Sequence, residues 1–268
     1  MVSGLLGILL VGGLFVPVDG QELSAQDIID RAVARAEEQR KAQPELAYEA
    51  TVESITEKLN GDGEVQETER ETYQQYPLEG VVYEELVAKE GEPLSDDDAR
   101  NERARREEFV EDVRERVAKG EEPLPEDENR IEFNEEFVER YDLRIAGEDV
   151  VDGHACWIIE IEPRPGDLPV RRRIDVALNN ATGRVWVSKE DYGLARVEFE
   201  MVKSVRFWGG ILGTLRNTVG RMEFRRTPDR VWLPATMDIK LDLRILFRNM
   251  RRRMVREWTD YSPVRANN

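Results

Sequence analysis

The sequence MDIKLDLRI at residues 237–245 alternates apolar and polar residues without a break. Successive side chains of a β-strand point to opposite faces, so this pattern predicts a strand with one apolar and one polar face. Such a strand needs neighbouring strands that pair with its backbone and a cover for its apolar face. The stretch therefore predicts an antiparallel sheet that is buried on one side.

Further strand signals lie on both sides of this stretch. Alternating or short apolar runs occupy residues 46–59, 65–76, 81–89, 142–145, 154–162, 184–187 and 195–201. The sequence NGDG at residues 60–63 predicts a hairpin turn, because Asn, Asp and Gly tolerate the positive φ angles of tight turns. We expect roughly ten strands in all, most of them antiparallel to their neighbours in the chain.

A helix is expected near the N-terminus. Ser24 with Asp27 resembles a capping box, and apolar residues spaced three and four apart follow to about Lys41. The sequence VRRRIDVAL at residues 170–178 predicts a second, short helix. Its three arginines are expected to be a solvated helix face, with the binding of a phosphate or a partner carboxylate as the alternative.

A strongly charged helix is expected at residues 95–119. Ser95 is a typical N-cap residue, the sequence DDD at 96–98 suits the positive end of a helix, and Gly120 is a typical terminating residue. The DDD run lacks the alternating ligands of a calcium-binding loop, so the helix dipole is the better explanation. We interpret this helix as an appended or covering element.

Many strands and few helices predict the fold class α+β. The architecture would be a large curled antiparallel sheet, a half-barrel, with an N-terminal helix and inserted covering helices. We expect residues 21–268 to form one such domain, with the charged helical insertion at about residues 95–120. Interiors of curled sheets hold an apolar ligand when side chains do not fill them.

The N-terminal segment resembles a signal peptide. Fourteen apolar residues run from Leu5 to Val18, which is too short for a bilayer span of about 20 residues but suits a signal-peptide core. We expect residues 1–20 to be removed after Gly20, so that the protein is exported. The first four residues carry no Lys or Arg, and a retained anchor or an ordinary buried segment are the alternatives.

The scarcity of His and Cys weakens most catalytic hypotheses. The chain has one His and one Cys, which leaves no His/Cys metal cluster and no disulfide within one chain. We expect Cys156 to pack in the core and His154 to be a hydrogen-bonded residue at the start of a strand. We therefore predict no enzyme, no catalytic residue, no metal and no other cofactor; a hydrolase with paired carboxylates is the remaining enzymatic alternative.

Charge is distributed unevenly along the chain, whose net charge is −17. Residues 21–141 hold 37 acidic and 16 basic residues, whereas residues 142–268 hold 18 acidic and 23 basic residues. The acidic half argues against nucleic acid as a partner, because phosphates would be repelled. The six arginines between Arg244 and Arg256 are consistent with anionic lipid head groups or with a solvated strand face.

Several segments resemble the outer-membrane lipoprotein-sorting protein family, the LolA/LolB-like carriers of the bacterial periplasm. They are the helix at residues 25–41 followed by YEATV at 48–52, and GRVWV at 183–187, KEDYGLARVE at 189–198 and VWLP at 231–234. The resemblance implies a half-barrel with helices as a lid, a hydrophobic cavity for lipid or acyl chains, and a location in the periplasm. The helix at 95–119 departs from the compact carriers, and no ligand-contacting residue carries over.

Alternation places one group of side chains on the inward face, where it lines either a ligand cavity or a filled core. The predicted cavity wall consists of Trp157, Ile159, Ile161, Phe199, Ile239, Leu241, Leu243 and Ile245. A second candidate is the glycine-rich sequence FWGGILG, which we interpret as a gate or a membrane-contact loop, with a bend under the core as the alternative. Its apolar side chains are Phe207, Trp208, Ile211 and Leu212.

The sequence thus favours a non-catalytic periplasmic carrier or binding protein for lipid, lipoprotein acyl chains or another hydrophobic ligand. The alternative is an envelope sensor or scaffold that binds a partner polypeptide through the same half-barrel and the acidic helix at 95–119. An envelope protein or a membrane surface would be the further partner, and nucleic acid is excluded.

Overall fold

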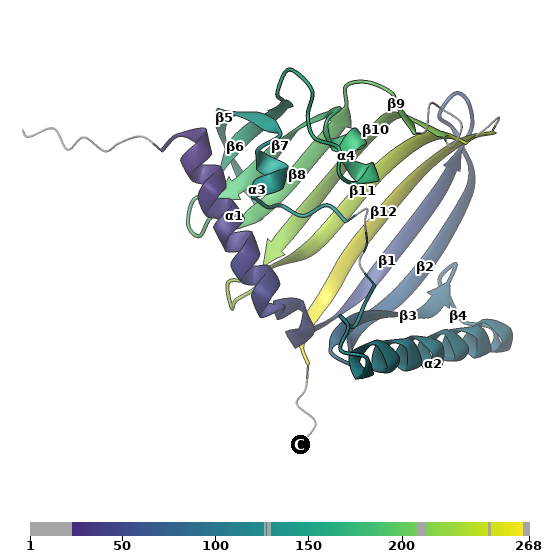
Figure 1. The fold of residues 1–268 in the computed structure, drawn as a ribbon. Coiled ribbons are helices and arrows are strands. Elements are labelled where there is room, and N and C mark those ends of the chain that lie inside the picture. Colours follow the sequence, from purple (N-terminus) through teal and green to yellow (C-terminus); the bar gives the residue numbers. More distant parts are fainter. Residues whose placement is uncertain (1–22, 126, 128–129, 208–212, 246–247, 265–268) are drawn as a thin grey trace, which may run out of the picture.

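One antiparallel sheet of twelve strands organises the described part of the chain (Figure 1). The computed structural model describes residues 23–125, 127, 130–207, 213–245 and 248–264. The signal peptide predicted at residues 1–20 lies outside the described residues. The sheet is not closed, and it carries helices at one side and at one end, which confirms the predicted class of a large curled antiparallel sheet with few helices.

The elements follow one another in a simple order along the chain. The helices are α1 (Ala25–Ala42), the 3-10 helix η1 (Pro44–Ala47), α2 (Asp96–Ala118), α3 (Glu135–Val138) and α4 (Arg173–Leu178). The first strands are β1 (Tyr48–Leu59), β2 (Val65–Leu78), β3 (Val81–Lys89), β4 (Glu92–Pro93), β5 (Tyr141–Val151) and β6 (His154–Pro163). The remaining strands are β7 (Ala181–Ser188), β8 (Leu194–Met201), β9 (Val205–Phe207), β10 (Gly213–Arg226), β11 (Trp232–Ile245) and β12 (Arg248–Pro263).

The strand order brings the two ends of the chain together. It reads β4-β3-β2-β1-β12-β11-β10-β8-β7-β6-β5, and the short β9 pairs with β10. Most neighbours in the chain pair as hairpins, but β4 and β5 lie at opposite edges of the sheet and β8 pairs with β10. In addition, β1 pairs with β12, the last strand. The strand predicted from residues 237–245 is β11, and it lies inside the sheet between β10 and β12.

Over most of the sheet one face is apolar and the other is polar, as the alternation predicts; the buried cluster with Cys156, Ile158 and Trp186 is the apolar part of the polar side. Residues that are paired across neighbouring strands point to the same side. We call the side that carries Ile159, Val185 and Ile239 the apolar face. The opposite side, which carries Glu160 and Arg184 among others, is the polar face.

Helix α1 covers the apolar face over β5 to β7. It begins where the sequence predicts, because the Ser24 hydroxyl accepts the backbone N–H of Asp27 at 3.1 Å and the Asp27 carboxylate accepts the N–H of Ser24 at 3.0 Å. Its apolar stripe packs with sheet residues in one core cluster: Ile28, Ile29, Ala32, Val33, Val138, Tyr141, Ile159, Ile161, Val185 and Val187. This cluster fastens the helix to one half of the sheet (Figure 1).

Helix α2 lies along β3 and is otherwise exposed, which confirms the charged helix predicted from the sequence (Figure 1). The Ser95 hydroxyl caps it by accepting the N–H of Asp98 at 3.1 Å. The Tyr83 hydroxyl of β3 donates to Glu102 at 3.0 Å, and its ring lies 4.8 Å from that of Phe109. Glu102 and Val113 are the only buried residues among the 23 of this helix, so nearly all of its charged surface faces solvent.

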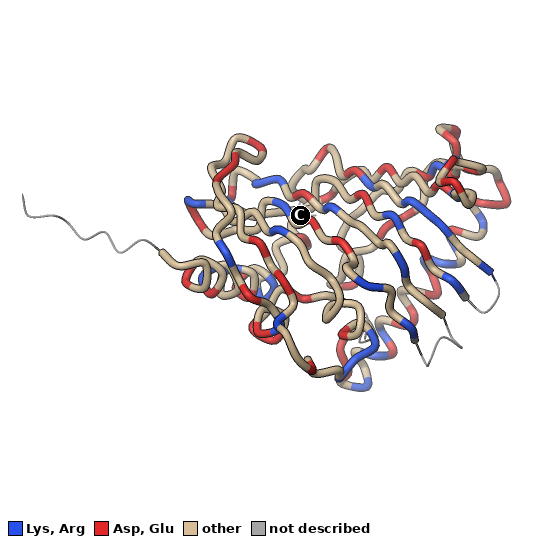
Figure 2. Tube along the Cα trace, turned by 90° about the horizontal axis from the view of Figure 1, so that it is seen from above, with Lys and Arg blue, Asp and Glu red and all other residues tan. Residues whose placement is uncertain are grey.

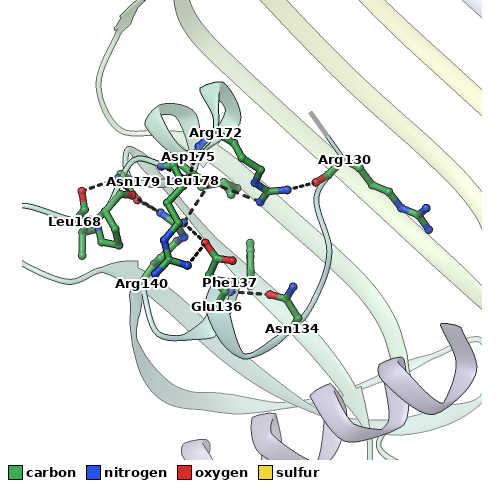
Figure 3. A network of polar contacts seen from close by, with 12 residues as sticks. Arg130, Asn134, Glu136, Phe137, Arg140, Leu168, Arg172, Asp175, Leu178 and Asn179 are labelled. Carbon is green, nitrogen blue, oxygen red and sulfur yellow. Dashed lines mark hydrogen bonds and ion pairs between the residues drawn. The ribbon is translucent and has the colours of Figure 1, made fainter. Parts of the chain in front are cut away.

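A buried ion pair fastens α3 and α4 to the sheet (Figure 3). Arg140, which precedes β5, is 2% exposed, and Asp175 of α4 is fully buried. The Arg140 guanidinium lies 3.2 Å from the Asp175 carboxylate and donates to the Asn179 side chain and the Pro169 carbonyl, both at 2.8 Å. Two segments that are distant in the sequence, the one that ends at Arg140 and residues 169–179, therefore meet at one arginine.

The Asp175 carboxylate is held ionised by its neighbours. It accepts the backbone N–H groups of Arg171 and Arg172 at 2.8 and 2.9 Å. Burial alone would raise the pKa of this carboxyl, but the two N–H donors and the charge of Arg140 outweigh it and hold the pKa below its ordinary value. Arg171 also pairs with Glu136 at 3.3 Å and Arg172 with Asp175 at 3.5 Å, so these two arginines have partners within the chain.

We predict that Cys156 is unreactive in the folded protein. Its side chain is fully buried in a cluster with Trp186 and Trp232, and burial raises the pKa of the thiol to about 11. A thiol reagent at pH 8 should therefore label less than a tenth of the protein within minutes, and all of it in guanidinium chloride. Rapid labelling of the native protein would contradict this packing.

Candidate functional site

The structure divides the predicted cavity wall into two groups. Ile159 and Ile161 are 0% and 4% exposed and belong to the core cluster beneath α1. Trp157 packs against the same cluster and stacks on the ring of Tyr192 at 5.7 Å. These three residues are therefore covered by protein in this structure.

The second group lies on the part of the apolar face that the core cluster beneath α1 does not include. Its members are half-buried side chains of β8, β10, β11 and β12, and none of the three core clusters formed by described residues includes them. We call this group the apolar floor; it consists of Phe199, Leu215, Ile239, Leu241, Leu243, Met250 and Met254. Four of the eight predicted wall residues thus come together on one open surface.

The side chains of the other predicted residues are outside what the structure describes. The structure describes the backbone of Ile245 and Phe207 but not their side chains. Trp208, Ile211 and Leu212 of the predicted gate fall outside the described residues altogether. Their roles stay predictions.

Gly220 makes room for the largest side chain of the floor, Phe199. Phe199 pairs with Gly183 on one side and with Gly220 on the other. A Cβ atom at Gly220 would lie 2.3 Å from Cε1 of the Phe199 ring, so the ring lies over that glycine. Glycine within a strand commonly marks such a close approach, and this is the signal by which the position could have been found.

A polar and aromatic cluster borders the floor on the side of β1. Trp258 is buried with Ala50 and Val52 beneath the ring of Tyr73. The Arg256 guanidinium lies 4.9 Å from the centre of the Trp258 ring and donates to Glu84 at 2.7 Å. The apolar floor ends at this cluster.

The polar face carries rows of alternating charge across the strands. Glu160 pairs with Arg184 at 3.0 Å, Glu198 with Arg221 at 3.6 Å, and Asp238 with Arg253 at 2.6 Å. A hollow of about 620 Å³ on this face is lined mainly by these and other charged side chains. It is unsuited to a hydrocarbon chain, so the polar face does not supply the apolar cavity that the sequence suggests.

Chemistry that would point to catalysis is scarce among the described residues. No group of three or more His, Cys, Asp or Glu side chains is placed to hold a metal ion in the part of the chain that the structure describes. His154 packs edge-on against the ring of Trp232 at 5.2 Å. Within the same described ranges, we find no helix with the length and apolar character needed to cross a membrane.

The fold and the open floor define an antiparallel curled-sheet protein with a partly covered apolar face, and solved structures of similar outline exist. A LolA superfamily protein from Nitrosomonas europaea is 11% identical over 91% of this chain and 95% of its own, with a TM-score of 0.37. An outer membrane lipoprotein-sorting protein domain from Vibrio parahaemolyticus is 13% identical over 88% and 93%, with a TM-score of 0.34.

A third match is MucB in its complex with MucA from Pseudomonas aeruginosa, at 11% identity over 90% of this chain and 99% of that one, with a TM-score of 0.26. No family model and no curated protein matches the chain.

Proposed function

We propose that this protein is a non-catalytic binding protein or carrier that holds the hydrocarbon part of a lipid, a lipoprotein acyl chain or another hydrophobic ligand on the apolar floor. It would act in the bacterial periplasm after export through the signal peptide at residues 1–20. The sequence resemblance to LolA-like carriers supports this location and this ligand class.

One observation carries the proposal. The apolar face is continuous across the sheet, yet the core cluster beneath α1 takes in only β5 to β7 and the adjoining Leu194 and Val197 of β8, while the floor on β8 to β12 is left half-buried. Each CH₂ group that leaves water contributes about 0.8 kcal/mol, so an alkyl chain lying along the floor would gain several kcal/mol. Contiguous apolar surface that the core leaves only half-buried is typical of interaction sites.

The proposed site includes the residues predicted from the sequence. Ile239, Leu241 and Leu243 form its centre, with Phe199 at one side and Ile245 at the end of β11. Trp157, Ile159 and Ile161 would contact ligand only where α1 moves away from the sheet. The loop containing Phe207, Trp208, Ile211 and Leu212 would act as the gate or touch the membrane.

We predict that Leu241→Glu weakens the binding of the neutral fluorescent probe N-phenyl-1-naphthylamine about tenfold or more. The change places a carboxylate in the middle of the floor, and an apolar ligand would have to desolvate it. The matched control is Lys240→Glu, which adds the same group on the polar face of the same strand, beside Arg253. Probe titrations of both variants and the parent protein measure the effect; equal affinities for all three would contradict the proposal.

Gentle purification followed by mass spectrometry of extracted lipids tests the ligand class directly. Bound acyl species in the parent protein, and their loss in Leu241→Glu, are the expected result. A protein that carries no lipid and binds no probe would overturn the proposal.

A second candidate function follows from α2. This helix presents charged residues to solvent along nearly all of its length, and it is held to β3 by few buried contacts. Such a surface suits a partner polypeptide in the cell envelope, as in a sensor or scaffold. A defined polypeptide that co-purifies with the parent protein, and is lost when α2 is deleted, would favour this function over the carrier.

A further inference from the structure

A cationic hollow adjoins the apolar floor where β12 passes the end of the β1–β2 hairpin. Its volume is about 360 Å³. The charged side chains that line it are all basic: Lys58, Arg251 and Arg252. Its other lining residues are uncharged, namely Leu59, Asn60, Gly61, Gln66, Asn249 and Met250.

Arg252 stands on the apolar face among floor residues. In the strand pairing it lies between Leu241 of β11 and Lys58 of β1. Met250 and Met254, two positions away on β12, point to the same side. An arginine side chain in this position can lay its alkyl stem on apolar neighbours while its guanidinium stays in water.

The guanidinium of Arg252 is available for a ligand. Arg251 pairs with Asp242 at 3.0 Å, and Arg253 pairs with Asp238 at 2.6 Å. Lys58 lies 3.4 Å from Glu67. Arg252 is exposed, and no hydrogen bond or ion pair to another described residue holds its side chain.

The β12 side of the hollow is basic although the protein is strongly acidic. Residues 248–253 contain four Arg residues and no acidic residue, whereas the β1–β2 hairpin on the other side of the hollow carries Asp62, Glu64 and Glu67 beside Lys58. Seen from above, Lys and Arg recur along the strands in the half of the sheet away from α1 (Figure 2). The arginines of β12 therefore favour an anion on their side of the hollow.

We propose that Arg252 binds the anionic head group, a phosphate or a carboxylate, of an amphiphile whose hydrocarbon chain lies on the apolar floor. This inference rests on the proposed function and specifies its ligand. The planar guanidinium donates two parallel hydrogen bonds to either oxyanion, a geometry that a lone ammonium does not provide. The floor would supply most of the affinity, and Arg252 would fix which end of the ligand lies in the hollow.

Three probes with the same ten-carbon chain test this inference: decyl phosphate, decanoate and 1-decanol. Each is titrated against the purified protein carrying N-phenyl-1-naphthylamine, and the displacement of that neutral probe is measured. We expect one or both anions to bind about tenfold tighter than 1-decanol, in line with a charge-assisted hydrogen-bonded pair. The tighter of the two anions shows whether a phosphate-ended lipid or a fatty acid is the better fit.

Arg252→Gln should lower the affinity for the two anions to that for 1-decanol and leave the affinity for 1-decanol unchanged. Arg252→Lys should keep part of the difference in affinity between the anions and 1-decanol. The matched control is Lys240→Gln, which removes one positive charge from the polar face and should change none of the affinities. The difference in affinity between the anions and 1-decanol should also shrink as the salt concentration rises.

The two proposals fail in different ways. If 1-decanol displaces the probe as well as the anions do, or if Arg252→Gln and Lys240→Gln behave alike, the head-group inference is overturned while the apolar site stands. If none of the three compounds displaces the probe, the floor does not bind hydrocarbon chains, and both proposals are overturned.

Discussion

Asp175→Ala is expected to lower the free energy of unfolding by about 3 to 5 kcal/mol, the usual range when one partner of a buried ion pair is removed. The substitution leaves the Arg140 guanidinium, which is 2% exposed, without its carboxylate. It also leaves the backbone N–H groups of Arg171 and Arg172 without an acceptor. Urea unfolding followed by tryptophan fluorescence measures the change.

Asp142→Ala is the matched control for this prediction. Asp142 lies 3.4 Å from Arg164, but both side chains are largely exposed, so the pair contributes at most about 1 kcal/mol. Similar losses of stability in the two variants would show that the buried pair does not hold α3 and α4 in place.

The effect of Asp175→Ala should also depend on pH. The folded protein lowers the pKa of this carboxyl below its unfolded value, which is about 3.9 for an aspartate. The stabilisation is therefore fully present above that value and is lost as the pH falls through the folded-state pKa. The stability difference between the parent protein and Asp175→Ala should be constant near neutral pH and shrink in acid.

Gly183→Val is expected to lower the free energy of unfolding by about 3 kcal/mol, because it overpacks a contact between two backbones. A Cβ atom at Gly183 would lie 2.2 Å from the carbonyl oxygen of Glu198 in the neighbouring strand. The clash can be relieved only by moving β7 and β8 apart, which weakens their hydrogen bonds. The melting temperature, followed by circular dichroism, should fall accordingly.

Gly61→Ala provides the control for the glycine prediction. No atom lies within 4 Å of a Cβ built at Gly61, so its replacement should change the stability by less than about 0.5 kcal/mol. If Gly183→Val were tolerated equally well, the close approach of β7 and β8 at this position would be wrong.

Local signals explain which parts of the fold could be predicted from the sequence. Ser24 and Ser95 identify the first turns of α1 and α2 because an N-cap acts within three residues. The alternation in residues 237–245 identifies β11 and its two faces because side-chain direction depends only on the strand itself. The turn at residues 60–63 likewise depends on four neighbouring residues.

Long-range features could not be predicted in this way. Nothing near β1 indicates that its partner is β12, and nothing near Arg140 indicates that Asp175 lies beside it. Helix α3 has four residues, too few for a periodic pattern. These features depend on segments that meet only after the chain has folded.

The candidate site could be predicted only in part, because local signals give the direction of a side chain but not its distant neighbours. Alternation correctly assigned Ile159 and Ile239 to the same face of the sheet. It carries no information on what covers that face, so the sequence could not distinguish Ile159, which is buried beneath α1, from Ile239, which is half-buried. Arg252 had a signal of its own. It interrupts the apolar positions between Met250 and Met254, where an alternating strand would carry an apolar residue.

The position of β12 has a consequence for the order of events during synthesis. The last strand, of 16 residues, lies between β1 and β11, so until it has been made the sheet consists of two pieces with unpaired edges. A nascent chain of this topology cannot complete its sheet before β12 has been synthesised, and its unpaired edges are prone to aggregation until then.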